Sequence, residues 1–217
     1  MTEEKIFKLK GKTLAIIDWA NVYGWFRKLK WEISPKKLFD YLKTYPEIID
    51  IRFYFGIEKG NKKSEEFHNL IKSIGYNLVT KEIKWVPVFL EDQNYLRKII
   101  KIIYDSLDNI DLMVYEDLEA IIETNFLRKI LKYPVYRRKC DFDVEITRDV
   151  LLNLNKVDGI ILFSGDGDYA PLAEEVIKAG KQMILVFAQG CRGKEYENFD
   201  KGLYQCSVKK LRKFIQK

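Results

Sequence analysis

Residues 160–169 read IILFSGDGDY, in which an apolar run leads directly into Asp166 and Asp168, two carboxylates separated by one glycine. A short apolar run of this kind is typical of a strand that is buried on both faces of a parallel sheet. Ligands of parallel α/β sheets bind in the crevice beyond the carboxyl ends of the strands, and Gly165 and Gly167 leave room there for close approach. Two acids at such a strand end therefore indicate a site for a hard metal cation.

A purely structural interpretation of the same acids is also open. In that interpretation Asp168 serves only as the N-cap of a helix from Tyr169 to Ala179, which Pro171 in its first turn and Gly180 after its end both favour. Whether other strands of the sheet also end in acids decides between the two interpretations.

A second apolar strand ends in the same way near the start of the chain. Residues 13–18 (TLAIID) form another short apolar run, which ends on Asp18 and is followed by Asn21. If both strands are central and parallel, their carboxyl ends lie at one edge of the sheet. Asp18, Asp166 and Asp168 are then expected to meet there, which favours the metal site.

A further pair of acids opens a predicted helix. Residues 137–149 (RRKCDFDVEITRD) carry a basic trio into Asp141 and Asp143, at the start of a helix expected from Phe142 to Leu154. Acids in a first turn ordinarily stabilise the helix dipole or cap the helix. One of these two acids therefore needs no further role, and the residues leave open which of them joins the site.

Composition limits the alternatives. With 217 residues, 47% of them hydrophobic and 14% aromatic, the chain suffices for one α/β core, or one core with an elaboration. No apolar run reaches the length of a membrane span, and the first residues lack the pattern of a signal peptide. We therefore expect a soluble, cytoplasmic protein without a membrane partner.

Histidine and cysteine usage excludes several kinds of catalytic site. His68, in a predicted helix, is the only histidine, so Ser-His-Asp triads and histidine-rich zinc sites lose their main residue. Cys140, Cys191 and Cys206 are far apart and odd in number, which supports neither a disulfide framework nor a zinc knuckle. A hydrolase of this composition has to use carboxylates and metal ions.

Positive charge is gathered at a few places. The net charge is +6, which by itself favours a polyanionic partner only weakly. The basic clusters are Lys59, Lys62 and Lys63, then Arg137, Arg138 and Lys139, and finally Lys209, Lys210, Arg212 and Lys213. Basic groups that flank an acidic centre suit a substrate with a phosphate backbone. For the C-terminal cluster a role in solubility alone is an equal alternative, whereas for the trio beside Asp141 we favour function.

Strands and helices alternate along most of the chain, which predicts a doubly wound α/β fold with helices on both faces of the sheet. Strands are expected over Thr13 to Asp18, Asp50 to Gly56, Tyr76 to Lys81, Gly159 to Ser164 and Gln182 to Phe187. Helices are expected over Val22 to Lys30, Pro35 to Tyr45, Ser64 to Ile74, Phe142 to Leu154, Tyr169 to Ala179 and Ser207 to Ile215.

The pattern changes over residues 86–135, where apolar residues recur at helical spacing in two runs. This predicts a two-helix insertion in a single domain that spans residues 1–217. A hairpin this apolar has to bury its stripe. We favour burial within the same chain, and a homodimer contact or a substrate lid are the alternatives.

Taken together, these segments resemble an NYN domain of the LabA-like group, a branch of the PIN-like nucleases. The resemblance covers Lys12 to about Phe187 and rests first on residues 16–21, where Asp18 is followed by Asn21, and on Asp143 and Asp149, six positions apart. Its most specific part is LFSGDGDYAPL at residues 162–172. The family pattern there is Ser-Gly-Asp-Ser-Asp-Phe-x-Pro-Leu, from which Gly167 and Tyr169 depart.

The resemblance implies a three-layer α/β/α sandwich with a mainly parallel five-stranded sheet and an acidic pocket that binds Mg²⁺ or Mn²⁺ and cleaves RNA. The carboxylates that would bind metal are Asp18, Asp143, Asp166 and Asp168, with Asn21, Ser164 and Asp149 as supporting residues and Asp141 as a rival of Asp143. Nucleic acid would be bound by Arg137, Arg138, Lys139, Lys62, Lys63 and Tyr169. The family usually has Lys-Gly-x-Asp before this helix, and the segment Arg138-Lys139-Cys140-Asp141 departs from that spacing. Single-stranded DNA is an alternative substrate, and a non-catalytic RNA-binding scaffold is an alternative function.

Four aromatic residues lie close in sequence to the acids, namely Tyr23, Trp25, Phe26 and Tyr169. Exposed aromatic rings stack on unpaired bases in proteins that bind single strands. Core packing is the expected role for at least two of the four.

Overall fold

The computed structural model describes residues 5–88, 135–199 and 201–217. These residues fall into two compact units. The first combines the chain up to Glu82 with Cys140–Lys217, and the second is drawn from Ile83–Lys139. The predicted pair of helices between residues 86 and 135 lies almost entirely outside the described residues, and so do the burial of its apolar stripe and the alternatives of a homodimer contact or a substrate lid.

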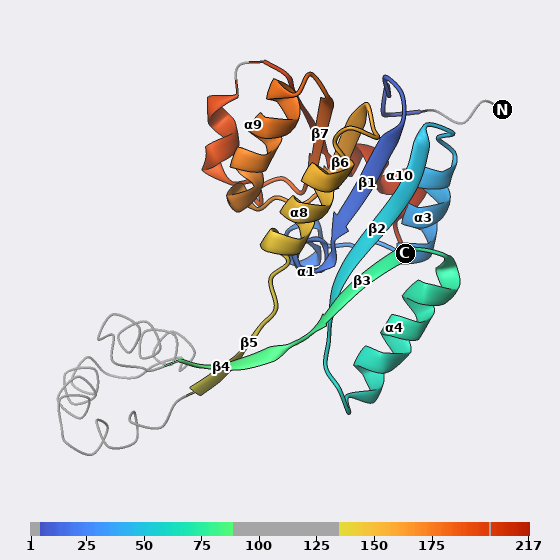
Figure 1. Ribbon diagram of the computed structural model, residues 1–217. Coiled ribbons are helices and arrows are strands. Elements are labelled where there is room, and N and C mark those ends of the chain that lie inside the picture. Colours follow the sequence, from blue (N-terminus) through green and yellow to red (C-terminus); the bar gives the residue numbers. More distant parts are fainter. Residues whose placement is uncertain (1–4, 89–134, 200) are drawn as a thin grey trace, which may run out of the picture. The chain divides into compact units, whose positions relative to one another are not determined.

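A six-stranded sheet forms the centre of the first unit (Figure 1). Its order is β3-β2-β1-β6-β7-β8, and every neighbouring pair is parallel. The strands are β1 Thr13–Asp18, β2 Ile48–Ile57, β3 Asn77–Glu82, β6 Gly159–Phe163, β7 Gln182–Phe187 and β8 Leu203–Ser207. The predicted α/β class with a mainly parallel sheet is confirmed.

The sixth strand corrects the expected strand count of five. All five predicted strands form, and β8 adds an edge strand beside β7. Its sequence, LYQCS, contains no apolar run, and only Cys206 of its residues is buried. An edge strand with one solvated side needs few apolar residues, so its sequence carries little strand signal.

Helices cover both faces of the sheet, which makes the expected three-layer sandwich. Alternate residues of β1 enter two separate cores: Ala15 and Ile17 pack on one side, and Leu14 and Ile16 on the other. The first core also receives side chains of α3 and α4, and the second receives side chains of α8 and α9. The ribbons of these helices flank the sheet in Figure 1.

The helix boundaries differ from the expected ones mainly near the acidic segments. The helices are α1 Trp19–Gly24, α2 Phe26–Leu29, α3 Pro35–Lys43, α4 Lys62–Ile74, α8 Asp143–Asn153, α9 Ala170–Lys178 and α10 Arg212–Ile215. Three 3₁₀ turns join them: η1 Gly167–Tyr169, η2 Lys194–Asn198 and η3 Val208–Leu211. The helix expected over Val22 to Lys30 is thus two short helices, and it begins directly after Asp18.

The described part of the second unit is an antiparallel ribbon of β4 Lys84–Val88 and β5 Val135–Lys139. The sequence did not predict these strands, because the helical spacing from residue 86 onward obscured the short run before it. Arg137, Arg138 and Lys139 therefore lie on a strand. No helix in the described residues is long and apolar enough to cross a membrane.

Candidate metal-binding site

The carboxyl ends of β1 and β6 place the first acids side by side. The two strands are neighbours in the sheet, and Ile17 is the register partner of Phe163. Asp18 directly follows Ile17, and Ser164 directly follows Phe163. Asp18 caps α1, and Asp166 caps the 3₁₀ turn η1. The expected meeting of acids at one sheet edge follows from this pairing.

A hydrogen-bond network joins the two strand ends. The Ser164 hydroxyl donates to Asp18 Oδ2 at 3.2 Å and accepts from the Asp166 backbone N–H at 3.2 Å. Asn21 Oδ1 accepts from the Gly165 N–H at 2.9 Å and from Trp25 Nε1 at 2.8 Å. Ser164 and Asn21 thus hold the acidic loop against β1.

Asp18 is a buried carboxyl with neighbouring acids. Its side chain belongs to a residue that is 7% exposed, and burial raises its pKa to about 6. The charges of Asp143 and Asp166 raise this pKa further, against the stabilising hydrogen bonds from Asn21 and Ser164. Burying a charged carboxylate costs free energy unless an opposite charge compensates it, so this position favours a cation.

Asp143 belongs to the same electrostatic cluster. It opens α8 and is partly buried. Its pKa is raised by burial and by the charges of Asp166, Asp141 and Asp168, against a hydrogen bond from the Tyr169 hydroxyl that lowers it. Asp141 is exposed and lies before the helix, and of these two acids it is Asp143, not Asp141, whose charge raises the pKa of Asp18. The geometry therefore favours Asp143 over Asp141 as a partner of Asp18.

Tyr169 is buried beneath these acids. Its ring is 1% exposed, so it offers no face to a nucleic-acid base, which corrects the binding role expected for it. Its hydroxyl lies against Asp143 and has no other hydrogen-bond partner among the described residues. Burial, the charges of Asp18 and Asp143 and the hydrogen bond to Asp143 raise the pKa of Tyr169, so this hydroxyl stays protonated.

Asp168 lies at the outer side of the cluster. It is exposed, and its backbone N–H donates to Asp166 Oδ1 at 3.1 Å. It does not cap the helix after it; Asp166 caps the turn instead. The helix-cap interpretation of Asp168 is therefore wrong.

Asp149 lies in a different network. Its Oδ2 accepts a hydrogen bond from the Tyr54 hydroxyl at 2.8 Å and lies 3.1 Å from Arg52 Nη1. Arg148 Nη2 lies 3.3 Å from its other oxygen. These contacts join α8 to β2, and Asp149 does not contribute to the raised pKa of Asp18 or Asp143.

The predicted basic residues lie on two elements. Lys62 and Lys63 are exposed in the first turn of α4. Lys63 stands four positions before Phe67, so the two share a face of the helix, and the Phe67 ring stacks on Trp19 of α1. Arg137, Arg138 and Lys139 lie on β5 of the second unit.

Sequence reasoning missed Glu195, on the 3₁₀ turn η2. A Cβ at Gly167 would overlap the Glu195 carboxylate, and a Cβ at Gly165 would overlap the Cys191 carbonyl oxygen. Gly193 N–H donates to Gly165 O at 2.8 Å. The loop after β7 thus packs against the acidic loop. No local pattern marks Glu195, since only the fold brings it near.

Lys81 at the end of β3 was also missed. Its Nζ lies 2.9 Å from both carboxylate oxygens of Glu145 and 4.8 Å from the centre of the Phe142 ring. Partial burial alone would raise the pKa of Glu145, but the hydrogen bond and charge of Lys81 lower it overall. Lys81 thus fixes the first turn of α8, from which Asp143 projects.

The donor chemistry of this cluster fits a hard divalent cation. Asp18, Asp143 and Asp166 supply carboxylate oxygens, and the buried charge of Asp18 is uncompensated. No three histidine, cysteine, aspartate or glutamate side chains converge tightly enough to hold an ion by themselves within the described residues. Mg²⁺ usually keeps several waters and uses one or two carboxylates, so full convergence is not required.

The raised pKa of Asp18 gives a first prediction. The folded-state pKa of about 6 exceeds the ordinary 3.8, so between these values the folded protein holds a proton that the unfolded chain releases. Stability without metal should therefore fall as the pH rises through this window, by about 3 kcal/mol at most, and level off above it. Urea melts in chelator should show this slope for the wild type and a shallower one for Asp18→Asn. If stability changed equally with pH in the wild type and in Asp18→Asn, the raised pKa would not belong to Asp18.

Comparisons with known proteins agree with this architecture. Residues 12–202 match the NYN domain, so the chain belongs to the NYN domain family, a branch of the PIN-like nuclease superfamily. The chain is 23% identical over 184 residues to Low amplitude and bright protein LabA of Synechococcus elongatus, which covers 84% of this chain and 76% of LabA. The resemblance to a LabA-like NYN protein, expected from the sequence, is confirmed.

A solved structure supports the same fold. The crystal structure of a protein of unknown function from Vibrio parahaemolyticus matches with a TM-score of 0.57 at 18% identity. The match covers 93% of this chain and 95% of that protein. At this identity the likeness concerns the fold alone.

Proposed function

We propose that the protein is a metal-dependent ribonuclease that hydrolyses phosphodiester bonds at the cluster of Asp18, Asp143 and Asp166. The observation that carries the proposal is the buried Asp18 carboxyl at the end of β1, whose pKa is raised by burial and by the charges of Asp143 at the start of α8 and Asp166 after β6. Perturbed carboxylates in such a position are characteristic of functional sites. Membership of the NYN family, a branch of the PIN-like nuclease superfamily, supports the proposal.

Each residue of the cluster has a role in this proposal. Asp18, Asp143 and Asp166 would hold Mg²⁺ or Mn²⁺, which when bound supplies positive charge for the phosphate and an acidic water for attack. Ser164 and Asn21 fix the positions of Asp18 and the acidic loop through their hydrogen bonds. Asp168, which is exposed and whose charge raises the pKa of Asp143, would be a fourth carboxylate for the metal, as expected from the sequence.

A second candidate is a non-catalytic RNA-binding protein with the same fold. The observation in its favour is that no three acidic side chains converge tightly within the described part of the chain. Such a protein would keep its basic surface and would bind RNA without cutting it.

The test is a cleavage assay on labelled single-stranded RNA and DNA with Mn²⁺, Mg²⁺ or chelator. We expect metal-dependent cleavage of RNA, with products that carry 5′-phosphate and 3′-hydroxyl ends, and no cleavage in chelator. Cleavage of DNA alone would change the substrate class. Binding without cleavage at any metal concentration would support the RNA-binding scaffold instead.

A further inference from the structure

The aromatic residues near the acids divide into two pairs. Trp25 and Tyr169 are each 1% exposed and belong to the core, whereas Tyr23 is 63% and Phe26 is 39% exposed. The centres of the Tyr23 and Phe26 rings lie 5.7 Å apart. Large exposed aromatic side chains carry a free-energy cost in water, so this exposed pair calls for a ligand with flat apolar faces.

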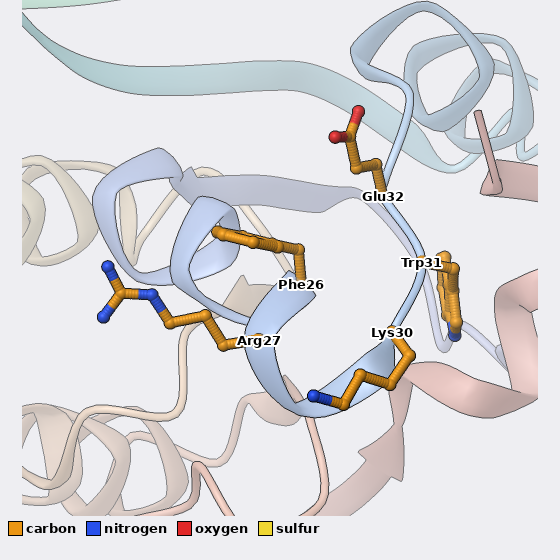
Figure 2. A pocket seen from close by; sticks show the side chains of 5 residues that line it. All are labelled: Phe26, Arg27, Lys30, Trp31 and Glu32. Carbon is orange, nitrogen blue, oxygen red and sulfur yellow. The ribbon is translucent and has the colours of Figure 1, made fainter. Parts of the chain in front are cut away.

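A hollow of about 430 Å³ lies directly beside this pair. Phe26 and Arg27 of α2 line it together with Lys30, Trp31 and Glu32 of the turn that follows (Figure 2). We call this hollow, with Tyr23 at its side, the α2 groove. It combines aromatic rings with basic side chains.

The α2 groove is positively charged. Its single lining acid, Glu32, is paired with Lys217, whose Nζ lies 2.9 Å from Glu32 Oε2. The Arg212 guanidinium lies 5.7 Å from the centre of the Trp31 ring and adds a further positive charge behind it. With Glu32 compensated, Arg27 and Lys30 leave a net positive field, which attracts phosphate.

Lys30 has an unusual backbone conformation. Its φ is 62°, and it is the only non-glycine residue with positive φ among the described residues. It ends α2 in the left-handed conformation, a position that glycine or asparagine normally occupies. A residue that keeps a strained conformation points to a functional constraint, and here the side chain that it retains lines the groove.

The groove lies close to the acidic cluster along the chain. α1 begins directly after Asp18, and α2 follows with almost no break. The helical path from Asp18 to Phe26 rises roughly 12 Å. Asn21, which holds the acidic loop, lies on the same short helix as Tyr23.

We propose that the α2 groove binds a single-stranded segment of the nucleic acid, with bases stacked on Tyr23 and Phe26 and phosphates against Arg27 and Lys30. This proposal rests on the proposed ribonuclease function for the identity of the polymer. The combination of stacking surfaces with a positive groove is the arrangement that binds single strands without base-specific readout. The site would deliver the strand to the acids instead of selecting a sequence.

The test is fluorescence anisotropy with a short labelled oligouridine in chelator, using Asp166→Asn protein as the background so that no cleavage interferes. The double variant Tyr23→Ala and Phe26→Ala should weaken binding about tenfold or more. The matched control is Tyr204→Ala on β8, an aromatic side chain that is 45% exposed on an edge strand of the sheet. We expect the control to bind like the background protein.

The basic side chains have separate tests. Arg27→Ala should lower the slope of log Kd against log salt by roughly 0.7, as one lost phosphate contact predicts for a single strand, while Lys156→Ala, at an exposed lysine after α8, should not. Lys30→Gly should weaken binding and yet raise the melting temperature by roughly 2 °C, because glycine adopts positive φ without strain. Loss of affinity through misfolding would lower the melting temperature instead.

The outcomes separate this proposal from the proposed function. If the wild type cleaves RNA and the groove variants bind oligouridine as tightly as the background protein, the binding role of the α2 groove is wrong and the nuclease function stands. Binding that depends on the groove, in a protein that never cleaves, would support the groove and overturn the nuclease. The binding role of the groove would also be wrong if oligouridine did not bind. The same holds if polyglutamate, a polyanion without bases, bound equally tightly at the same groove residues.

Discussion

Asp166→Asn protein is expected to cleave RNA at least about 100-fold more slowly than the wild type while retaining its fold. Even residues that only orient metal ligands cost 10- to 100-fold when they are replaced, and Asp166 would be a ligand itself. Asparagine keeps the shape of the side chain and is an equally good cap, so the hydrogen bond from the Asp168 N–H can persist. The measurement is the initial cleavage rate at saturating Mn²⁺.

Asp18→Asn should lose activity to the same extent and gain stability in chelator. The buried carboxylate of Asp18 has no compensating cation among the described residues, so a neutral amide removes the cost of burying it. A variant that is both inactive and more stable is the signature of a residue kept for function. Mn²⁺ should raise the melting temperature of the wild type and not that of this variant.

Asp40→Asn is the matched control for both variants. Asp40 is exposed, and its ion pair with Lys36 on α3 is of the surface kind that contributes little to stability. It should cleave like the wild type. Full activity of Asp166→Asn would remove that residue from the site, and loss of activity in Asp40→Asn would show that the assay reports something other than the acidic cluster.

The central part of the site was predictable because it depends on local patterns. A short apolar strand followed by an acid specifies both the strand and the place of the carboxylate, as at Asp18 and Asp166. The position of Glu195 was not predictable, because it depends on how the loop after β7 packs on Gly167. Lys81 was missed for a similar reason, since its partner Glu145 is distant in sequence. β8 was missed because an edge strand needs few apolar residues.

Asp149 and Asp143 lie on different sides of α8. Six positions along an α-helix correspond to a rotation that leaves Asp143 and Asp149 roughly 120° apart around the axis. Asp143 faces the acids at the strand ends, while Asp149 faces Arg52 and Tyr54 of β2. The contacts of Asp149 therefore favour a structural role for it, while Asp143 keeps its place among the proposed metal-binding acids.

Asp149→Ala is therefore expected to destabilise the protein by about 2–3 kcal/mol and to leave the cleavage rate of the folded protein within a few-fold of the wild type. The Asp149 and Arg52 side chains are only 12% and 18% exposed, and removing one partner of such a pair leaves a buried charge and an unpaired Tyr54 hydroxyl. Arg52 keeps its ion pair with Asp50 at 2.9 Å, which limits the loss. Urea denaturation measures the stability, and cleavage well below the melting temperature measures the activity.

A double-mutant cycle with Arg52→Ala distinguishes the two roles of Asp149. If Asp149 acts through Arg52 and Tyr54, the two losses of stability should be strongly non-additive, because each variant breaks the same ion pair. A stable Asp149→Ala protein with a cleavage rate as low as that of Asp166→Asn would show the opposite, that Asp149 acts with the metal-binding acids. The cycle thus tests, with stability and activity as separate readouts, whether α8 contributes one acid to the site or two.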